Sequence, residues 1–210
     1  MRALLAFAVI VLATSPALGQ GTSAFESWEG THTLLGSYGT GSPPIIATIR
    51  AGTPIDPYHG LQCLELEDNS PTGTPQAFVA WIKDLAPGAL VTVSLWRYDT
   101  TPGASPSCRL WGHWNDDVND INGYAESAGG NEDYGLGLGW DEVSWTWENP
   151  VGRASHLSLV VEVRTYSEPG DVLLIDAMTV TGPPGVFIEI PESGSPVESQ
   201  TWSSIKALYR

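Results

Sequence analysis

Residues 85–98, LAPGALVTVSLWRY, are a turn followed by a regular alternation of side-chain type. Successive side chains of a β-strand point to opposite faces, so Val91, Val93 and Leu95 share one face. The other face carries two hydroxyl groups and two large aromatic rings, those of Thr92, Ser94, Trp96 and Tyr98. The stretch therefore predicts a strand with an apolar face for a core and an opposite face suited either to a second packing layer or to a ligand.

Similar short segments, alternating or apolar and bounded by Pro, Gly, Asn or Asp, recur along the chain. They are AFESW (24–28), SPPIIATIR (42–50), GLQCLELED (60–68), QAFVAWIKDL (76–85), SCRLWGHW (107–114), EVSWTWENP (142–150), HLSLVVEVRTY (156–166) and DVLLIDAMTVTG (171–182), with one further short strand at 186–190. No segment before the C-terminal tail has a sustained helical repeat, so the crossover helices of a parallel sheet are missing. The pattern predicts an all-β fold, an antiparallel β-sandwich of the jelly-roll type.

The first residues predict export. Arg2 precedes an apolar run at 3–13, and Ala17 and Gly19 occupy the small-residue positions of a cleavage site. We expect a signal peptide at 1–19 rather than a membrane span, because the apolar run is too short. The β-sandwich domain is expected at 20–183, a linker at 184–200, and a short C-terminal helix or sorting tail at 201–210.

Charge limits the partners. The formal net charge of −15 disfavours phosphate backbones and anionic lipid, so we expect no nucleic-acid partner. We expect no membrane-spanning segment either, because no apolar run is long enough. Cations such as calcium and neutral ligands remain compatible with it. The acidic loop at 115–137 is long enough to expect a functional or mobile segment; its carboxylates suit either a loose calcium site or a solvated surface.

The chain has two cysteines, Cys63 and Cys108, both in predicted strands. In an exported protein they are candidates for a disulfide bond, which in the chain-entropy model contributes about 3–4 kcal/mol to stability. The sequence leaves the alternative of two buried thiols open, since it does not show the distance between the Cα atoms.

Motifs of catalysis are missing. The chain contains no Gly-x-Ser-x-Gly, no His-Glu-x-x-His and no phosphate-binding glycine loop. Glu65 and Glu67 share a strand face, but the turn that follows favours a solvated strand end over the paired carboxylates of a glycosidase.

A second aromatic face lies on SCRLWGHW, where Arg109, Trp111 and His113 share one side. It resembles the side of Trp96 and Tyr98 in combining flat rings with polar groups. Sugar rings stack on such rings while their hydroxyl groups bond to polar side chains. We therefore expect a glycan platform of Trp96, Tyr98 and Trp111 for stacking, with His113 and Arg109 as hydrogen-bonding groups. The alternative is a satellite cluster packed under loops.

Several motifs resemble one family. The run L-x-P-G-x-x-V-x-x-S-x-W at 85–96 is similar to a hallmark of carbohydrate-binding modules with the galactose-binding-like jelly-roll fold, with Val91 where the family often has an aromatic residue. SAFESW (23–28), HGLQCLELED (59–68), the Trp-led strand at 140–147 and LLIDAMTV (173–180) follow in the family's order. The resemblance covers about 24–182 and implies the jelly-roll fold and glycan binding.

The resemblance also implies a structural calcium ion near the ends of the first and last strands, with Glu26 and Asp176 as its candidate ligands. Ala177 replaces the second Asp of the family's closing motif. The tail TWSSIKALYR (201–210) is similar to a C-terminal segment of exported bacterial proteins, and suggests sorting or surface attachment.

The function expected from the sequence is a secreted, non-catalytic module that binds polysaccharide. The alternative is a structural or adhesive extracellular surface protein that self-associates or is attached through its tail. A jelly-roll glycanase or lyase is a third hypothesis, without a catalytic motif to support it.

Overall fold

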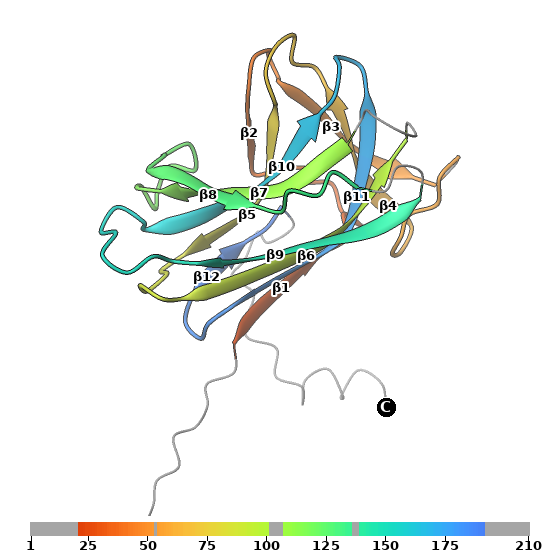
Figure 1. The fold of residues 1–210 in the computed structure, drawn as a ribbon. Coiled ribbons are helices and arrows are strands. Elements are labelled where there is room, and N and C mark those ends of the chain that lie inside the picture. Colours follow the sequence, from red (N-terminus) through yellow and green to blue (C-terminus); the bar gives the residue numbers. More distant parts are fainter. Residues whose placement is uncertain (1–20, 53, 101–106, 136–138, 192–210) are drawn as a thin grey trace, which may run out of the picture.

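The computed structural model describes residues 21–52, 54–100, 107–135 and 139–191. These residues form two antiparallel six-stranded sheets that pack face to face, seen as two layers in Figure 1. The predicted all-β sandwich is confirmed. Within these residues there is no helix with the length and apolar character needed to cross a membrane.

The first sheet has the strand order β3-β4-β11-β6-β9, with β1 paired to β11. Its strands are β1 (Thr22–Glu26), β3 (Ile45–Ala51), β4 (Gln62–Asp68), β6 (Leu90–Asp99), β9 (Trp140–Glu148) and β11 (Val172–Gly182). The alternating part of residues 85–98 thus forms most of β6, which lies between β11 and the edge strand β9.

The second sheet has the order β12-β5-β10-β7-β8, with β2 paired to β5. Its strands are β2 (Gly36–Tyr38), β5 (Gln76–Lys83), β7 (Ser107–Asn115), β8 (Glu126–Gly130), β10 (Ser158–Tyr166) and β12 (Phe187–Glu189). The short strands β2 and β8 were not predicted. Tyr38 is the single large apolar side chain of β2, and β8 reads ESAGG, so neither has a detectable alternation.

The main core lies between the sheets and is built from the predicted apolar faces. Val91, Val93 and Leu95 of β6 pack there together with Val161 and Val163 of β10. A smaller cluster of Phe78, Trp81 and Val160 lies on the opposite, outer side of the second sheet, with Leu35 and Ile121 packed against it. The outer face of the second sheet is therefore partly covered by Leu35 and Ile121.

The predicted disulfide bond is wrong. Cys63 and Cys108 are both buried free thiols. Cys108 packs in the core on β7 of the second sheet, whereas Cys63 alternates with the core residues Leu64 and Leu66 and so points to the outer side of the first sheet. One sheet separates the two side chains. Burial raises the pKa of the Cys63 thiol to about 11, which keeps this thiol protonated and unreactive.

Arg97 is a buried cation between the two sheets. It follows Leu95 on the inner face of β6 and is only 2% exposed. Its Nε and Nη2 donate to Asp141 Oδ2 of the neighbouring strand β9, each at 3.0 Å. Its Nη1 donates to the carbonyl oxygens of Cys108 on β7, at 2.6 Å, and of Asp133, at 2.8 Å. One side chain thus joins both sheets to the loop before Tyr134.

We predict that Arg97→Met lowers the free energy of unfolding by about 3 kcal/mol, because Asp141 and two carbonyl groups lose a buried charged donor. The matched control is Arg50→Met: Arg50 pairs with Glu65 at 2.6 Å, but both side chains are about a quarter exposed. That loss should cost less than about 1 kcal/mol. Urea unfolding of both variants provides the measurement. Equal losses of stability would contradict the role of Arg97 in joining the two sheets.

Candidate functional site

The predicted site residues lie on two different surfaces. Trp96 and Tyr98 are on the outer face of β6 in the first sheet, opposite to the core side of Leu95. Arg109, Trp111 and His113 are on the outer face of β7 in the second sheet, opposite to Leu110 and Trp114. The single platform of all five residues is therefore wrong, because the whole sandwich separates its two halves. Sequence alternation assigned each face correctly but did not show which sheet each strand joins.

A loop covers the Trp96 half. The ring of Tyr58 stacks on Trp96 with 3.7 Å between centroids and an interplanar angle of 11°. Trp140 contacts Tyr98 edge to face at 5.5 Å and donates from Nε1 to the Asp56 carbonyl at 3.0 Å. The stacking surface of Trp96 is occupied by the protein itself, so this half functions as a packing layer beneath the loop at 54–61.

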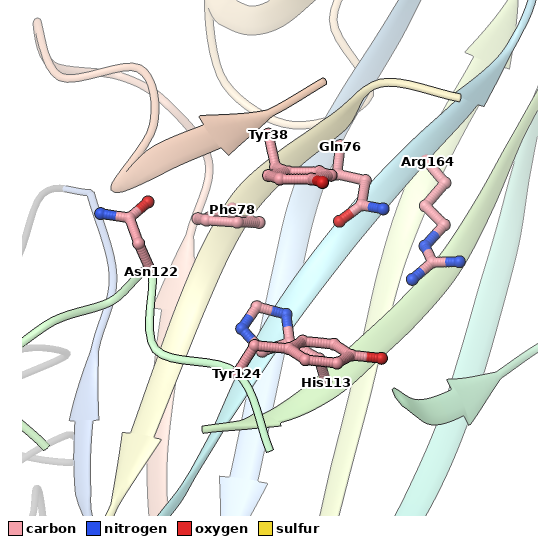
Figure 2. A pocket seen from close by; sticks show the side chains of 7 residues that line it. All are labelled: Tyr38, Gln76, Phe78, His113, Asn122, Tyr124 and Arg164. Atoms are coloured by element: carbon pink, nitrogen blue, oxygen red, sulfur yellow. The ribbon is translucent and has the colours of Figure 1, made fainter. Parts of the chain in front are cut away.

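The other half opens into a pocket. Its volume is about 370 Å³, and its walls combine aromatic rings with polar groups from β2, β5, β7, β10 and the segment before β8. Figure 2 shows the seven lining side chains: Tyr38, Gln76, Phe78, His113, Asn122, Tyr124 and Arg164. His113 is the one residue of the sequence-predicted set that lines it.

Strand register explains why these side chains meet. Residues directly opposite one another in neighbouring strands share a face. Tyr38 pairs with Gln76, Gln76 with Arg164, and Arg164 with Arg109, which makes one row across four strands. The next row contains Phe78, Glu162 and Trp111. The pocket is therefore a property of the outer face of the second sheet.

A buried carboxylate holds this face together. Glu162 on β10 is 1% exposed. Its Oε1 bonds to His113 Nδ1 on β7, and its Oε2 accepts from Arg164 Nε at 2.7 Å. With the Gln76 amide nitrogen turned toward it, Gln76 on β5 also donates to both oxygens, at 3.3 and 3.2 Å. Three donors from three strands offset the cost of burying the charge and fix the orientation of their own side chains.

This contact also sets the chemistry of His113. A carboxylate only accepts hydrogen bonds, so Nδ1 carries the proton. His113 Nε2 is buried and has no hydrogen-bond partner among the described residues. In the neutral imidazole this nitrogen is an acceptor. The ring centroids of Phe78 and Tyr124 lie 5.4 and 5.6 Å from that of the imidazole, so both rings pack against it.

The acidic loop supplies one wall of the pocket. Its carboxylates accept from its own backbone: Asp117 Oδ1 from Asn119 N at 2.8 Å, and Asp120 Oδ1 from Asn122 N at 3.0 Å. These turns place Asn122 and Tyr124 at the pocket, with Tyr124 59% exposed. The carboxylates of the loop thus shape its turns, and the turns bring two of its side chains to the pocket.

Beside the pocket, the same face continues as an arginine–aromatic strip. The Arg109 guanidinium carbon lies 3.9 Å from the Tyr134 ring centroid and 5.1 Å from that of Tyr166. Trp111 lies 5.8 Å from Arg109 and 4.9 Å from Arg164, measured between its ring centroid and each guanidinium carbon. Trp111 Nε1 donates to Ser127 Oγ of β8 at 3.0 Å, which fixes the indole.

The two expected calcium ligands are both buried, but each already accepts backbone hydrogen bonds. Glu26 Oε1 accepts from Trp28 N at 2.6 Å. Asp176 accepts from His59 N at 2.8 Å and Ala177 N at 2.6 Å, and burial raises the pKa of its carboxyl group. In the part of the chain that the structure describes, no group of three or more His, Cys, Asp or Glu is arranged to hold a metal ion, which does not fit an oxygen-rich calcium shell. The calcium site stays a prediction.

Sequence reasoning missed most of the pocket. The signal that was present lies in HLSLVVEVRTY, where Val160, Glu162, Arg164 and Tyr166 alternate with core residues. A carboxylate in a strand otherwise so apolar indicates a buried polar network. Tyr38 and Tyr124 had no such signal, because neither lies in a segment with a readable strand pattern.

Comparisons with known proteins identify the fold. No protein-family model matches the chain, and no curated protein matches it in sequence. Among solved structures, it is similar to the CBM22-1 xylan-binding domain of Paenibacillus barcinonensis Xyn10C, with a TM-score of 0.55 and 15% identity over 80% of this chain and 98% of that one. The CBM22-1-CBM22-2 tandem domain of the same enzyme also gives a TM-score of 0.55 at 15% identity, over 80% of this chain and 48% of the tandem.

A third structure is that of the CBM22-1-GH10 modules of Clostridium thermocellum Xyn10B complexed with xylohexaose. It gives a TM-score of 0.51 and 12% identity, over 79% of this chain and 29% of that one. At such identities the likeness concerns the fold. The chain thus has the β-sandwich fold of carbohydrate-binding modules, as the sequence motifs implied.

We predict that Glu162→Gln lowers the free energy of unfolding by about 2 kcal/mol, because His113 and Arg164 lose a charged acceptor. The matched control is Glu189→Gln, since Glu189 pairs with Lys83 at 3.0 Å near the surface; we expect less than about 1 kcal/mol there. Chemical unfolding measures both, and a Glu162 variant as stable as the wild type would contradict the role given to this carboxylate.

Proposed function

We propose that the chain is a secreted, non-catalytic carbohydrate-binding module that takes a polysaccharide on the outer face of its second sheet. The observation that carries this proposal is the pocket itself, in which exposed aromatic rings stand beside fixed hydrogen-bonding groups. Tyr38 and Tyr124 are 66% and 59% exposed on the two sides of Gln76, His113 and Arg164. Aromatic rings next to polar groups suit the apolar faces and hydroxyl groups of a sugar.

Each polar group has a defined role in the proposal. Glu162 holds the His113 ring through Nδ1, so that the imidazole forms a fixed wall of the pocket. Arg164 keeps its two Nη groups available as donors while its Nε is bound to Glu162. Asn122, exposed at the tip of the acidic loop, offers both a donor and an acceptor. Tyr38 and Tyr124 provide stacking surfaces.

Binding is favoured over hydrolysis by the distribution of carboxylates. A typical glycosidase places two carboxylates on either side of the scissile bond. No Asp or Glu lines the described pocket, and Glu162 beneath it is engaged by His113 and Arg164. Glu65, the acid considered from the sequence, is paired with Arg50 on the other sheet.

Xylan is the ligand to test first, because the solved structures that share this fold above include domains named as xylan-binding. Export, expected from residues 1–19, is consistent with a polysaccharide partner outside the cell.

We predict that soluble xylan retards the protein in affinity gel electrophoresis and that Tyr124→Ala weakens binding about tenfold or more. Loss of one stacking ring worth about 1.4 kcal/mol corresponds to a factor of ten. The matched control is Tyr58→Ala in the loop over the first sheet, also an exposed tyrosine, which should bind like the wild type. If Tyr58→Ala lost binding and Tyr124→Ala kept it, the site would lie on the first sheet instead.

The same experiment separates the alternative function. A wild-type protein that no polysaccharide in a broad panel retards would overturn the proposal in favour of a structural or adhesive surface protein. Self-association that buries Trp111 and Tyr124, seen by analytical ultracentrifugation of wild type and variants, would support that alternative.

A further inference from the structure

Two arginines face each other beside the pocket. Arg109 on β7 and Arg164 on β10 are directly opposite in the strand register, so both side chains lie on the outer face of the second sheet. Like charges in directly opposite positions destabilise a sheet. The chain has only 9 Lys and Arg against 24 Asp and Glu, and within this pair only Arg164 has a carboxylate partner, Glu162.

Arg109 differs from every other Lys and Arg in the part of the chain that the structure describes. Arg50, Lys83, Arg97, Arg153 and Arg164 each pair with a carboxylate. Arg109 forms no ion pair there; its Nε donates to the Glu132 carbonyl at 3.1 Å. The guanidinium therefore keeps donors for a ligand although the protein has a large excess of carboxylates.

Aromatic rings fix the position of this cation. Arg109 lies over Tyr134 at 3.9 Å and near Tyr166 at 5.1 Å, and these two rings contact each other edge to face at 5.0 Å. Arg97 holds the segment of Tyr134 through the Asp133 carbonyl. A guanidinium held by aromatic rings has no carboxylate to neutralise its charge. Its planar fork of N–H groups can donate two parallel hydrogen bonds to one carboxylate of a ligand.

Trp111 connects the two cations to the proposed binding face. Both guanidinium carbons lie within 6 Å of its ring centroid, at 5.8 and 4.9 Å. A sugar bound next to Trp111 therefore lies close to both guanidinium groups. Arg164 also lines the pocket, where Figure 2 shows its guanidinium group at the edge beyond His113 and Tyr124.

We propose that this arginine pair binds the carboxylate of a uronic acid, so that the ligand is a polysaccharide with acidic sugar residues rather than a purely neutral one. The inference rests on the proposed function, because it assigns the ligand class of the same face. Arg109 is the specificity-determining residue, since Arg164 is already partly neutralised by Glu162.

The test compares glucuronoxylan with the same polymer after reduction of its carboxyl groups to alcohols, by isothermal titration of the full chain. The acidic polymer should bind the wild type about five- to tenfold more tightly. The difference should shrink between about 50 mM and about 500 mM NaCl, because salt screens exposed charges. Arg109→Gln should remove the preference, so that the variant binds the acidic and the reduced polymer about equally.

Arg153→Gln is the matched control, since Arg153 is exposed and lies beside Glu126, away from the arginine pair; it should keep the preference. Equal affinity of the wild type for both polymers overturns the inference alone, and so does an Arg109→Gln variant that keeps the preference. A wild type that binds neither polymer overturns the proposed function and the inference with it. A sulfated, uronate-free xylan bound as tightly as glucuronoxylan would assign the pair to anions in general and overturn the selection of carboxylate.

Discussion

The buried carboxylate of Glu162 is the interaction on which the proposed binding face depends. It lies at 1% exposure on the outer side of β10, where it bonds to His113 of β7, Arg164 of its own strand and Gln76 of β5. A single buried charge is costly, so it constrains its partners to one arrangement. The result is a row of fixed polar groups between exposed aromatic rings. This is the property a glycan site needs, since sugars bind through stacking and directional hydrogen bonds together.

The outer face of the first sheet is covered at its aromatic residues, whereas that of the second sheet is partly open, because different loops pack on them. On the first sheet, the loop at 54–61 lays Tyr58 on Trp96, so the aromatic residues there pack against the protein itself. On the second sheet, Leu35 and Ile121 cover only the part of the face around Phe78, Trp81 and Val160. The remaining part stays open between Tyr38 and Tyr124. Arg97 supports the open side from within the sandwich, because it joins β6 to the carbonyl groups of Cys108 and Asp133.

Strand periodicity in the sequence was sufficient for the fold class and for ten of the strands, and it assigned the faces of β6 and β7 correctly. It was insufficient for the site, because the site depends on which strands become neighbours. Trp96 and Trp111 have the same local pattern, yet β6 pairs with β11 and β9 whereas β7 pairs with β10 and β8. The disulfide prediction was wrong for the same reason, since sequence does not show on which side of which sheet Cys63 and Cys108 lie. Tyr38 and Tyr124 come from short or irregular segments that have no periodicity to detect.

The most direct test of this account is to map the ligand on the protein by amide chemical-shift perturbation with a xylo-oligosaccharide, followed by one that carries a glucuronic acid branch. The account predicts shifts at Gln76, His113, Tyr124 and Arg164 with both ligands, and further shifts at Arg109 and Trp111 with the branched one. Perturbations confined to Tyr58, Trp96 and Trp140 would contradict it, because the ligand would then occupy the outer face of the first sheet.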